Sequence, residues 1–215
     1  MKKSNIAILS DFDETITSEN ILNQLYKRFA SPIYKNFIER WNNGEISTQE
    51  EIEGCFATVK TNRAVMEAYL SEVNIDPGFS SLLNYCNERK TPLVIVSDGL
   101  RWYIDYILQN NNIHDVRVYA NEIFFEPSGF RFDFPWFDDQ NPLQGTSKKK
   151  IVLKYQQLGY AVFYIGDGLS DTGAADAADV LFSRDYLTEY ARDNNVETVE
   201  FSELSDVLDH LWYIN

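Results

Sequence analysis

Short apolar runs of strand type alternate along most of the chain with segments of helical periodicity. The runs at 6–10, 92–97, 116–120, 161–165, 180–183 and 197–201 are rich in β-branched, leucine and aromatic residues, as buried strands are. Helical spacing of apolar positions marks 79–89, 100–111, 148–158, 171–178, 186–194 and 203–213. This alternation predicts an α/β fold built on a doubly wound, mostly parallel, Rossmann-like sheet.

The first long interruption of this alternation follows Thr15. Residues 17–76 show helical periodicity and no convincing strand, and they are too many for an ordinary crossover connection. We therefore expect a small helical cap domain at 17–76, inserted into an α/β catalytic core made of 1–16 and 77–215. Pro77-Gly78 marks the return to the core.

A second interruption, at 122–137, alternates aromatic residues on either side of Pro127-Ser128-Gly129. This pattern predicts a β-hairpin with one aromatic face. Such a face serves either as a wall for a ligand or as cross-strand pairs that cover the core. We expect the second use, which is the commoner one.

Asp11 and Asp13 stand one residue apart where the first apolar run stops. Because side chains alternate along a strand, both acids emerge on the same side while Phe12 turns into the core. Crowded carboxylates repel each other, and their hard oxygen ligands suit Mg²⁺, whose charge offsets theirs. Taken alone, the segment is equally compatible with an Asp-rich turn that caps the next element.

Two later strands also end in polar residues, and one helix begins with lysines. The segments are Ser97-Asp98-Gly99, Gly166-Asp167-Gly168-Leu169-Ser170-Asp171, and Thr146-Ser147-Lys148-Lys149-Lys150. Each acid or hydroxyl is also compatible with a simple cap, but cations in the first turn oppose the helix dipole and favour a bound anion. Ligands of open α/β sheets bind outside the carboxyl ends of the strands, so we expect these segments to converge on one crevice.

Together these segments resemble the four motifs of the haloacid dehalogenase superfamily of phosphatases. The matching residues are Asp11-Phe12-Asp13-Glu14-Thr15, Ser97, Lys148 and Gly166-Asp167-Gly168-Leu169-Ser170-Asp171. Within the superfamily, the chain looks like the branch that contains phosphoserine phosphatase, the phosphocholine and phosphoethanolamine phosphatases, and the methionine-salvage phosphatase acting on 2-hydroxy-3-keto-5-methylthiopentenyl 1-phosphate. Residues 181–187 are similar to the last of these.

This resemblance implies a Mg²⁺-dependent phosphomonoester hydrolase with an aspartyl-phosphate intermediate. Asp11 would be the nucleophile, and Asp13 would act as general acid and then as general base. The metal would be held by Asp11, the backbone carbonyl of Asp13 and Asp167, with Asp171 behind them or acting through water. Ser97, the Gly99 N–H and Lys148 would bind the phosphate oxygens. Lys148 is chosen among the three lysines because the family's lysine precedes the first apolar helix position, here Ile151, by three.

The substrate is less well indicated, and several alternatives stay open. Phosphoserine phosphatases pair an early cap glutamate with a cap arginine; here Glu19 falls about one position early and no arginine occurs between Arg40 and Arg63. Methionine-salvage and phosphocholine relatives often carry cysteines in the loop before the lysine, and residues 138–147 have none. We expect Glu19 to contribute to specificity. A phospho-acceptor module that holds phosphate without releasing it is the alternative of a different class, disfavoured by Asp13.

Composition restricts the kinds of molecule that this chain is expected to bind. The chain has 215 residues with 19 basic and 33 acidic side chains, giving a net charge of −14. Such a surface repels nucleic acid and anionic membranes, so we expect a small-molecule phosphate ester as partner and a monomer or homodimer. Asp11 breaks the N-terminal apolar segment, which argues against a signal peptide, and a cytoplasmic location is expected.

Overall fold

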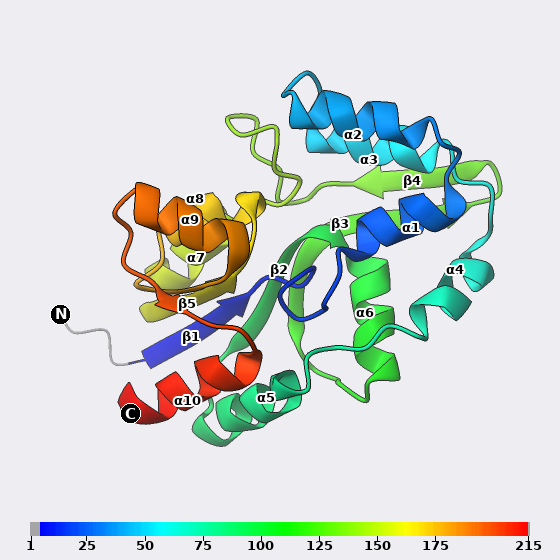
Figure 1. Ribbon diagram of the computed structural model, residues 1–215. Coiled ribbons are helices and arrows are strands. Elements are labelled where there is room, and N and C mark those ends of the chain that lie inside the picture. Colours follow the sequence, from blue (N-terminus) through cyan, green and yellow to red (C-terminus); the bar gives the residue numbers. More distant parts are fainter. Residues whose placement is uncertain (1–4, 215) are drawn as a thin grey trace.

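The sheet of this protein contains seven strands in the order β4-β3-β2-β1-β5-β6-β7 (Figure 1). The computed structural model describes residues 5–214. The strands are β1 (Asn5–Ser10), β2 (Leu93–Leu100), β3 (Arg117–Glu126), β4 (Gly129–Asp133), β5 (Tyr160–Gly166), β6 (Val180–Ser183) and β7 (Val199–Glu200). All neighbours pair in parallel except β3 and β4, which are antiparallel. The predicted mostly parallel sheet is confirmed.

Helices cover both faces of this sheet (Figure 1). One face is covered by α5 (Gly78–Arg89), α6 (Arg101–Asn110) and α10 (Leu204–Ile214), and the other by α7 (Lys148–Gln157), α8 (Thr172–Ala175) and α9 (Asp185–Asp193). Along β1, Ile8 packs into the first layer, while Ala7 and Leu9 pack into the second. Period-two alternation of apolar side chains therefore builds two buried layers, as a doubly wound fold requires.

Four helices lie between β1 and α5, in the segment expected to form a cap. They are α1 (Ile21–Phe29), α2 (Tyr34–Asn42), α3 (Thr48–Phe56) and α4 (Arg63–Leu70). The two ends of the segment meet at an antiparallel bridge between Thr17 and Ile75. Cap side chains such as Leu25 and Phe56 share one buried cluster with side chains of the sheet, so the domain boundaries at 17 and 76 stay a prediction.

The hairpin differs from expectation in its first strand. The strand expected at 116–120 and the first strand of the hairpin are one continuous element, β3, which continues beyond its pairing with β2 to pair with β4. On α3, Phe56 packs edge-on against Phe130 and Phe132 of β4, with ring centroids 5.2 Å apart in both pairs. The aromatic face therefore packs against the cap, whose helix α3 lies beside β4 in Figure 1. The expected cross-strand pairing is present as well, because Phe125 and Phe130 face each other across the two strands with ring centroids 5.8 Å apart and pack against the buried core.

Most other boundaries lie within three residues of expectation, and two elements are shorter. The helix expected at 171–178 is a 3₁₀ turn, Leu169–Asp171, followed by the four-residue α8. The strand expected at 197–201 shrinks to β7, which forms only two ladder pairs with β6 at the edge of the sheet. None of the helices within residues 5–214 is both long and apolar enough to cross a membrane.

Candidate active site

The predicted site residues gather at the carboxyl ends of three adjacent strands. Asp11 follows β1 and its N–H donates to the carbonyl of Ile165 on β5 (2.9 Å). Asp167 follows β5, and Ser97 lies within β2 on the other side of β1. From β1 the chain continues first to β2 and β3 on one side and later to β5 on the other, so this edge is the switch point at which open α/β sheets bind ligands.

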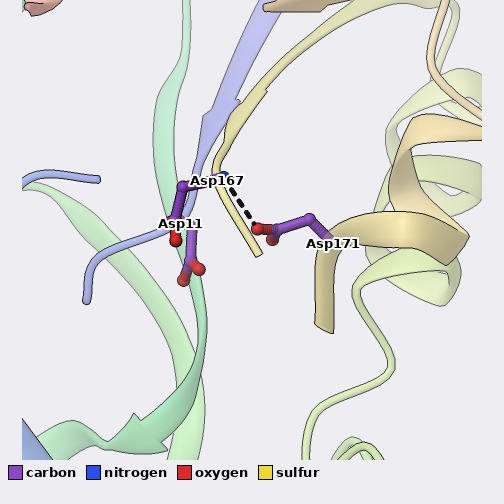
Figure 2. Close-up of side chains that lie close together, drawn as sticks. All are labelled: Asp11, Asp167 and Asp171. Carbon is purple, nitrogen blue, oxygen red and sulfur yellow. Dashed lines mark hydrogen bonds between the residues drawn. The ribbon is translucent and has the colours of Figure 1, made fainter. Parts of the chain in front are cut away.

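Three carboxylates form the centre of the site. Asp11, Asp167 and Asp171 are all buried, and one oxygen of each lies within 4.8 Å of the others. Figure 2 shows Asp171 reaching from its helical turn toward the strand ends that carry Asp11 and Asp167. Three hard oxygen donors at this spacing are a suitable ligand set for a divalent cation such as Mg²⁺.

Lys148, the first residue of α7, provides the positive charge inside this cluster. Its Nζ lies 2.7 Å from Asp11 Oδ2 and 2.6 Å from Asp171 Oδ1, and it donates to Ser170 Oγ at 2.8 Å. Burial alone would lower the pKa of Lys148, but Asp11 and Asp171 hold it well above its usual range. Lys149 and Lys150 are exposed, so the structure brings only Lys148 of the three into the site.

The carboxylates carry more negative charge than Lys148 offsets. Burial and the neighbouring Asp171 raise the pKa of Asp11 well above its usual range, against the effect of Lys148. The same two causes raise the pKa of Asp167 to about 7, although a 2.5 Å hydrogen bond from Thr15 Oγ1 opposes them. A site whose acids resist ionisation in this way favours a bound cation, which would return them to the charged form.

Asp171 differs from the other two because each of its oxygens accepts two hydrogen bonds, whereas Asp11 Oδ1 accepts from the Phe12 N–H (2.7 Å) and Asp11 Oδ2 from Lys148. Oδ1 accepts from the Tyr164 hydroxyl (2.5 Å) and from Lys148, and Oδ2 accepts from the N–H groups of Asp167 (3.0 Å) and Gly168 (2.9 Å). The side chain thus fixes the turn that follows β5 and orients Lys148. This arrangement suits a positioning role better than direct metal binding.

Asp13 lies beside the start of the first cap helix. Its Oδ1 accepts from the N–H of Ile21 (2.7 Å) and its Oδ2 from the hydroxyl of Tyr103 on α6 (2.5 Å). Burial raises the pKa of Asp13 to about 6, and the Tyr103 bond limits the increase. An acid with this pKa can both donate and accept a proton near neutral pH. A Cβ at Gly99 would overlap the Tyr103 hydroxyl, so glycine is required there.

The end of β2 is held by hydrogen bonds of its own. The Gly99 N–H donates to Ser97 Oγ (3.0 Å), so binding phosphate through this N–H would require the Ser97 hydroxyl to turn away. Asp98 accepts from the N–H of Thr146 (2.7 Å), and burial raises its pKa to about 6. This bond ties the β2 end to the loop that leads into Lys148.

A cavity of about 340 Å³ opens from these residues toward the cap. Its floor includes Asp11, Asp13, Ser97, Gly99, Lys148 and Asp167, and its cap wall is formed by Asn20, Leu22, Asn23, Ile38, Trp41, Asn42, Thr48 and Glu51. Glu19 does not line it. That side chain is exposed and accepts from Gln24 Nε2 at 3.1 Å.

Several functional residues were not identified from the sequence. The hydroxyl of Tyr103 donates to Asp13, and that of Tyr164 donates to Asp171. Glu51 lines the cavity from α3. Only Tyr164 had a usable signal, because it lies two positions before Gly166 and so points to the same face of β5. The others depend on contacts between distant segments that no local pattern reveals.

Comparison with known proteins gives consistent matches over nearly the whole chain. The family described as haloacid dehalogenase-like hydrolase matches residues 8–176. A 2-hydroxy-3-keto-5-methylthiopentenyl-1-phosphate phosphatase of Brevibacillus brevis is 26% identical over 207 residues, covering 94% of this chain and 93% of its own. The enzyme of the same name from Bacillus thuringiensis (strain Al Hakam) is 26% identical over 98% of this chain and 97% of its own. A phosphoserine phosphatase solved as a phospho-aspartyl intermediate analogue superposes with a TM-score of 0.71 at 16% identity, covering 96% and 98%.

Proposed function

Because the chain belongs to the haloacid dehalogenase-like hydrolase family, we propose that it hydrolyses a small phosphomonoester through an aspartyl-phosphate formed on Asp11. The observation that carries this proposal is the pairing of Asp11 with Asp13 at one strand end. A buried carboxylate held by a lysine lies next to a second acid whose pKa is about 6. The first is placed as a nucleophile and the second as a proton donor.

The residues present fit Mg²⁺. Asp11 and Asp167 offer carboxylate oxygens, and the backbone carbonyl of Asp13 is the further donor that the family resemblance implies. Asp171 accepts from the N–H of Asp167 and so holds the turn that carries this ligand. When bound, the ion would neutralise charge on the phosphate oxygens and on these acids. The negative charge of the buried acids that Lys148 does not offset supports the presence of Mg²⁺ in the working enzyme.

In the first step, Asp11 forms a bond to phosphorus as the bond from phosphorus to the alcohol oxygen breaks. Asp13 gives that oxygen its proton, so a neutral alcohol leaves. In the second step, Asp13 accepts a proton from the attacking water, the bond between Asp11 and phosphorus breaks, and phosphate is released. Lys148 and Ser97 stabilise the non-bridging oxygens in both steps.

The proposed leaving group is a small metabolite, methionine-salvage-like or phosphoserine-like. The names of the relatives in sequence support the first and those of the structural neighbours the second. A phosphocholine or phosphoethanolamine type is the alternative. A cytoplasmic location and action as a monomer or homodimer, without nucleic acid or membrane, belong to the same proposal. The net charge of −14 supports the part that excludes nucleic acid and anionic membranes as partners.

Phosphate release from a panel of phosphorylated metabolites, with Mg²⁺ and with excess chelator, tests this proposal. We expect Mg²⁺-dependent release from some esters, abolished by chelation and restored by added metal. Asp11→Asn should reduce turnover at least ~10³-fold, because binding alone cannot replace the covalent step. Full activity in excess chelator would contradict the Mg²⁺ dependence. Release from no ester would contradict the proposed hydrolysis and favour a phospho-acceptor module.

A further inference from the structure

The cap wall of the cavity contains one buried carboxyl that the reaction does not use. Glu51 lies on α3, is 6% exposed and lines the cavity. It is the one charged side chain among the cap residues that line this cavity in the described part of the chain. The cavity's lysine, Lys148, is already engaged by Asp11 and Asp171.

The surroundings of Glu51 stabilise a negative charge only weakly. Its Oε1 accepts a weak hydrogen bond from Cys55 Sγ (3.3 Å), and the Tyr26 hydroxyl also interacts with the carboxyl. No lysine or arginine is among the groups that act on it, and burial raises its pKa to about 7. A group in this state exchanges hydrogen bonds readily with uncharged oxygens, as acceptor or as donor.

The rest of the cap wall has matching chemistry. Three amides, on Asn20, Asn23 and Asn42, face the cavity. Beside Glu51, Thr48 Oγ1 accepts from Trp41 Nε1 at 2.9 Å. The remaining cap-wall side chains, Leu22 and Ile38, are apolar. Such a wall suits hydroxyl or carbonyl oxygens joined to an apolar end.

A carboxylate on the substrate would find no lysine or arginine among the cap residues that line this wall. Besides Glu51, the cavity is lined by Asp13, Glu14 and Asp98, so a second negative charge away from the phosphate would meet like charges in a partly desolvated site. In the cap wall, an ammonium group would find one carboxyl, Glu51, which is already bonded to Cys55, and the group would lose its hydration. Both charged classes are therefore disfavoured relative to an uncharged one.

We propose that Glu51 is a specificity-determining residue that selects phosphate esters whose leaving group is uncharged and carries hydroxyl or carbonyl oxygens, and that it rejects leaving groups with a carboxylate. This inference rests on the proposed phosphatase function. It narrows the substrate class within that function by excluding amino-acid-type leaving groups.

The test compares kcat/KM at about pH 7 for glycerol 1-phosphate, 3-phosphoglycerate and phosphoethanolamine, which differ chiefly in the charge of the leaving group. We expect the wild-type protein to favour glycerol 1-phosphate at least ~10-fold over each of the others. In Glu51→Gln, the ratio of 3-phosphoglycerate to glycerol 1-phosphate should rise at least ~10-fold. Glu53→Gln is the matched control, because Glu53 is exposed on the same helix and lies outside this cavity, and its ratio should stay within about twofold of wild type.

A wild-type preference for 3-phosphoglycerate or phosphoethanolamine would overturn the inference without any variant. The inference can therefore be refuted even if the Glu51 variant fails to fold. Equal ratios in Glu51→Gln and wild type would also overturn it. The failure of the proposed function looks different: the wild-type protein would then release phosphate from no ester, including a simple aryl phosphate.

Discussion

Tyr103→Phe should move the pH profile of the reaction while leaving the fold intact. The Tyr103 hydroxyl donates to Asp13 Oδ2 at 2.5 Å, and both groups are buried. A hydrogen bond to a charged acceptor contributes about 1.5–3 kcal/mol, and one pKa unit corresponds to about 1.36 kcal/mol. Because the bond stabilises ionised Asp13, its loss should raise the pKa of Asp13 from about 6 by about one to two units.

The assay is the pH dependence of kcat/KM for phosphate release. Asp13 must carry its proton when the alcohol leaves, so kcat/KM falls as pH rises through the pKa of Asp13 in the free enzyme. In Tyr103→Phe, this basic limb should shift to higher pH by about one to two units. Tyr106→Phe is the control, because Tyr106 lies on the same helix, is half-buried and lies outside the cavity that Asp13 lines. A lowered rate with an unmoved basic limb would refute the reasoning and reduce Tyr103 to a packing residue.

Two further predictions concern the metal site. Asp167→Ala should raise the Mg²⁺ concentration needed for activity far more than Asp171→Ala does. Asp171→Ala should instead lower the free energy of unfolding more, by about 3 kcal/mol or more, because it leaves buried partners unpaired. Metal titrations and denaturant unfolding of both variants check this ranking, and equal metal requirements would contradict it. Burial raises the folded-state pKa values of Asp13 and Asp98 to about 6 and of Asp167 to about 7, so their protonation stabilises the metal-free fold at low pH and this stabilisation is lost as pH rises through about 6 to 7. Without metal, the melting temperature should fall between about pH 5 and pH 8, and Mg²⁺ should raise it mainly at pH 8; an equal effect of Mg²⁺ at both values would contradict this.

The fold and the family were largely predictable because they depend on local patterns. Strand ends marked by Asp11, Ser97 and Asp167 can be read from short segments, and the alternation of strands and helices predicts their convergence. The continuous β3 was missed because Glu122 interrupts the apolar run, although the backbone ladder of β3 continues through it to pair with β4. Edge pairing of this kind is decided by the partner strand and not by local propensity.

The supporting residues of the site were not predictable in the same way. The hydrogen bond from Tyr103 to Asp13 joins residues 90 positions apart, and nothing in the periodicity of α6 indicates it. Glu51 and Glu19 are both acids on or next to cap helices, yet only the packing of α3 against the hairpin brings the first to the cavity. Sequence reasoning chose Glu19 for specificity; this stays a prediction, and Glu19→Gln beside Glu51→Gln in the charge-panel assay compares the two directly.

The measurement that tests the central claim most directly is the location of the phosphoryl group on the protein. Protein incubated with Mg²⁺ and an acyl phosphate such as acetyl phosphate, then quenched in acid, digested and examined by mass spectrometry, should carry one phosphoryl group on Asp11, and Asp11→Asn should carry none. A label on Ser97, or turnover of the ester with no label trapped on Asp11, would contradict a covalent aspartyl-phosphate mechanism at this site.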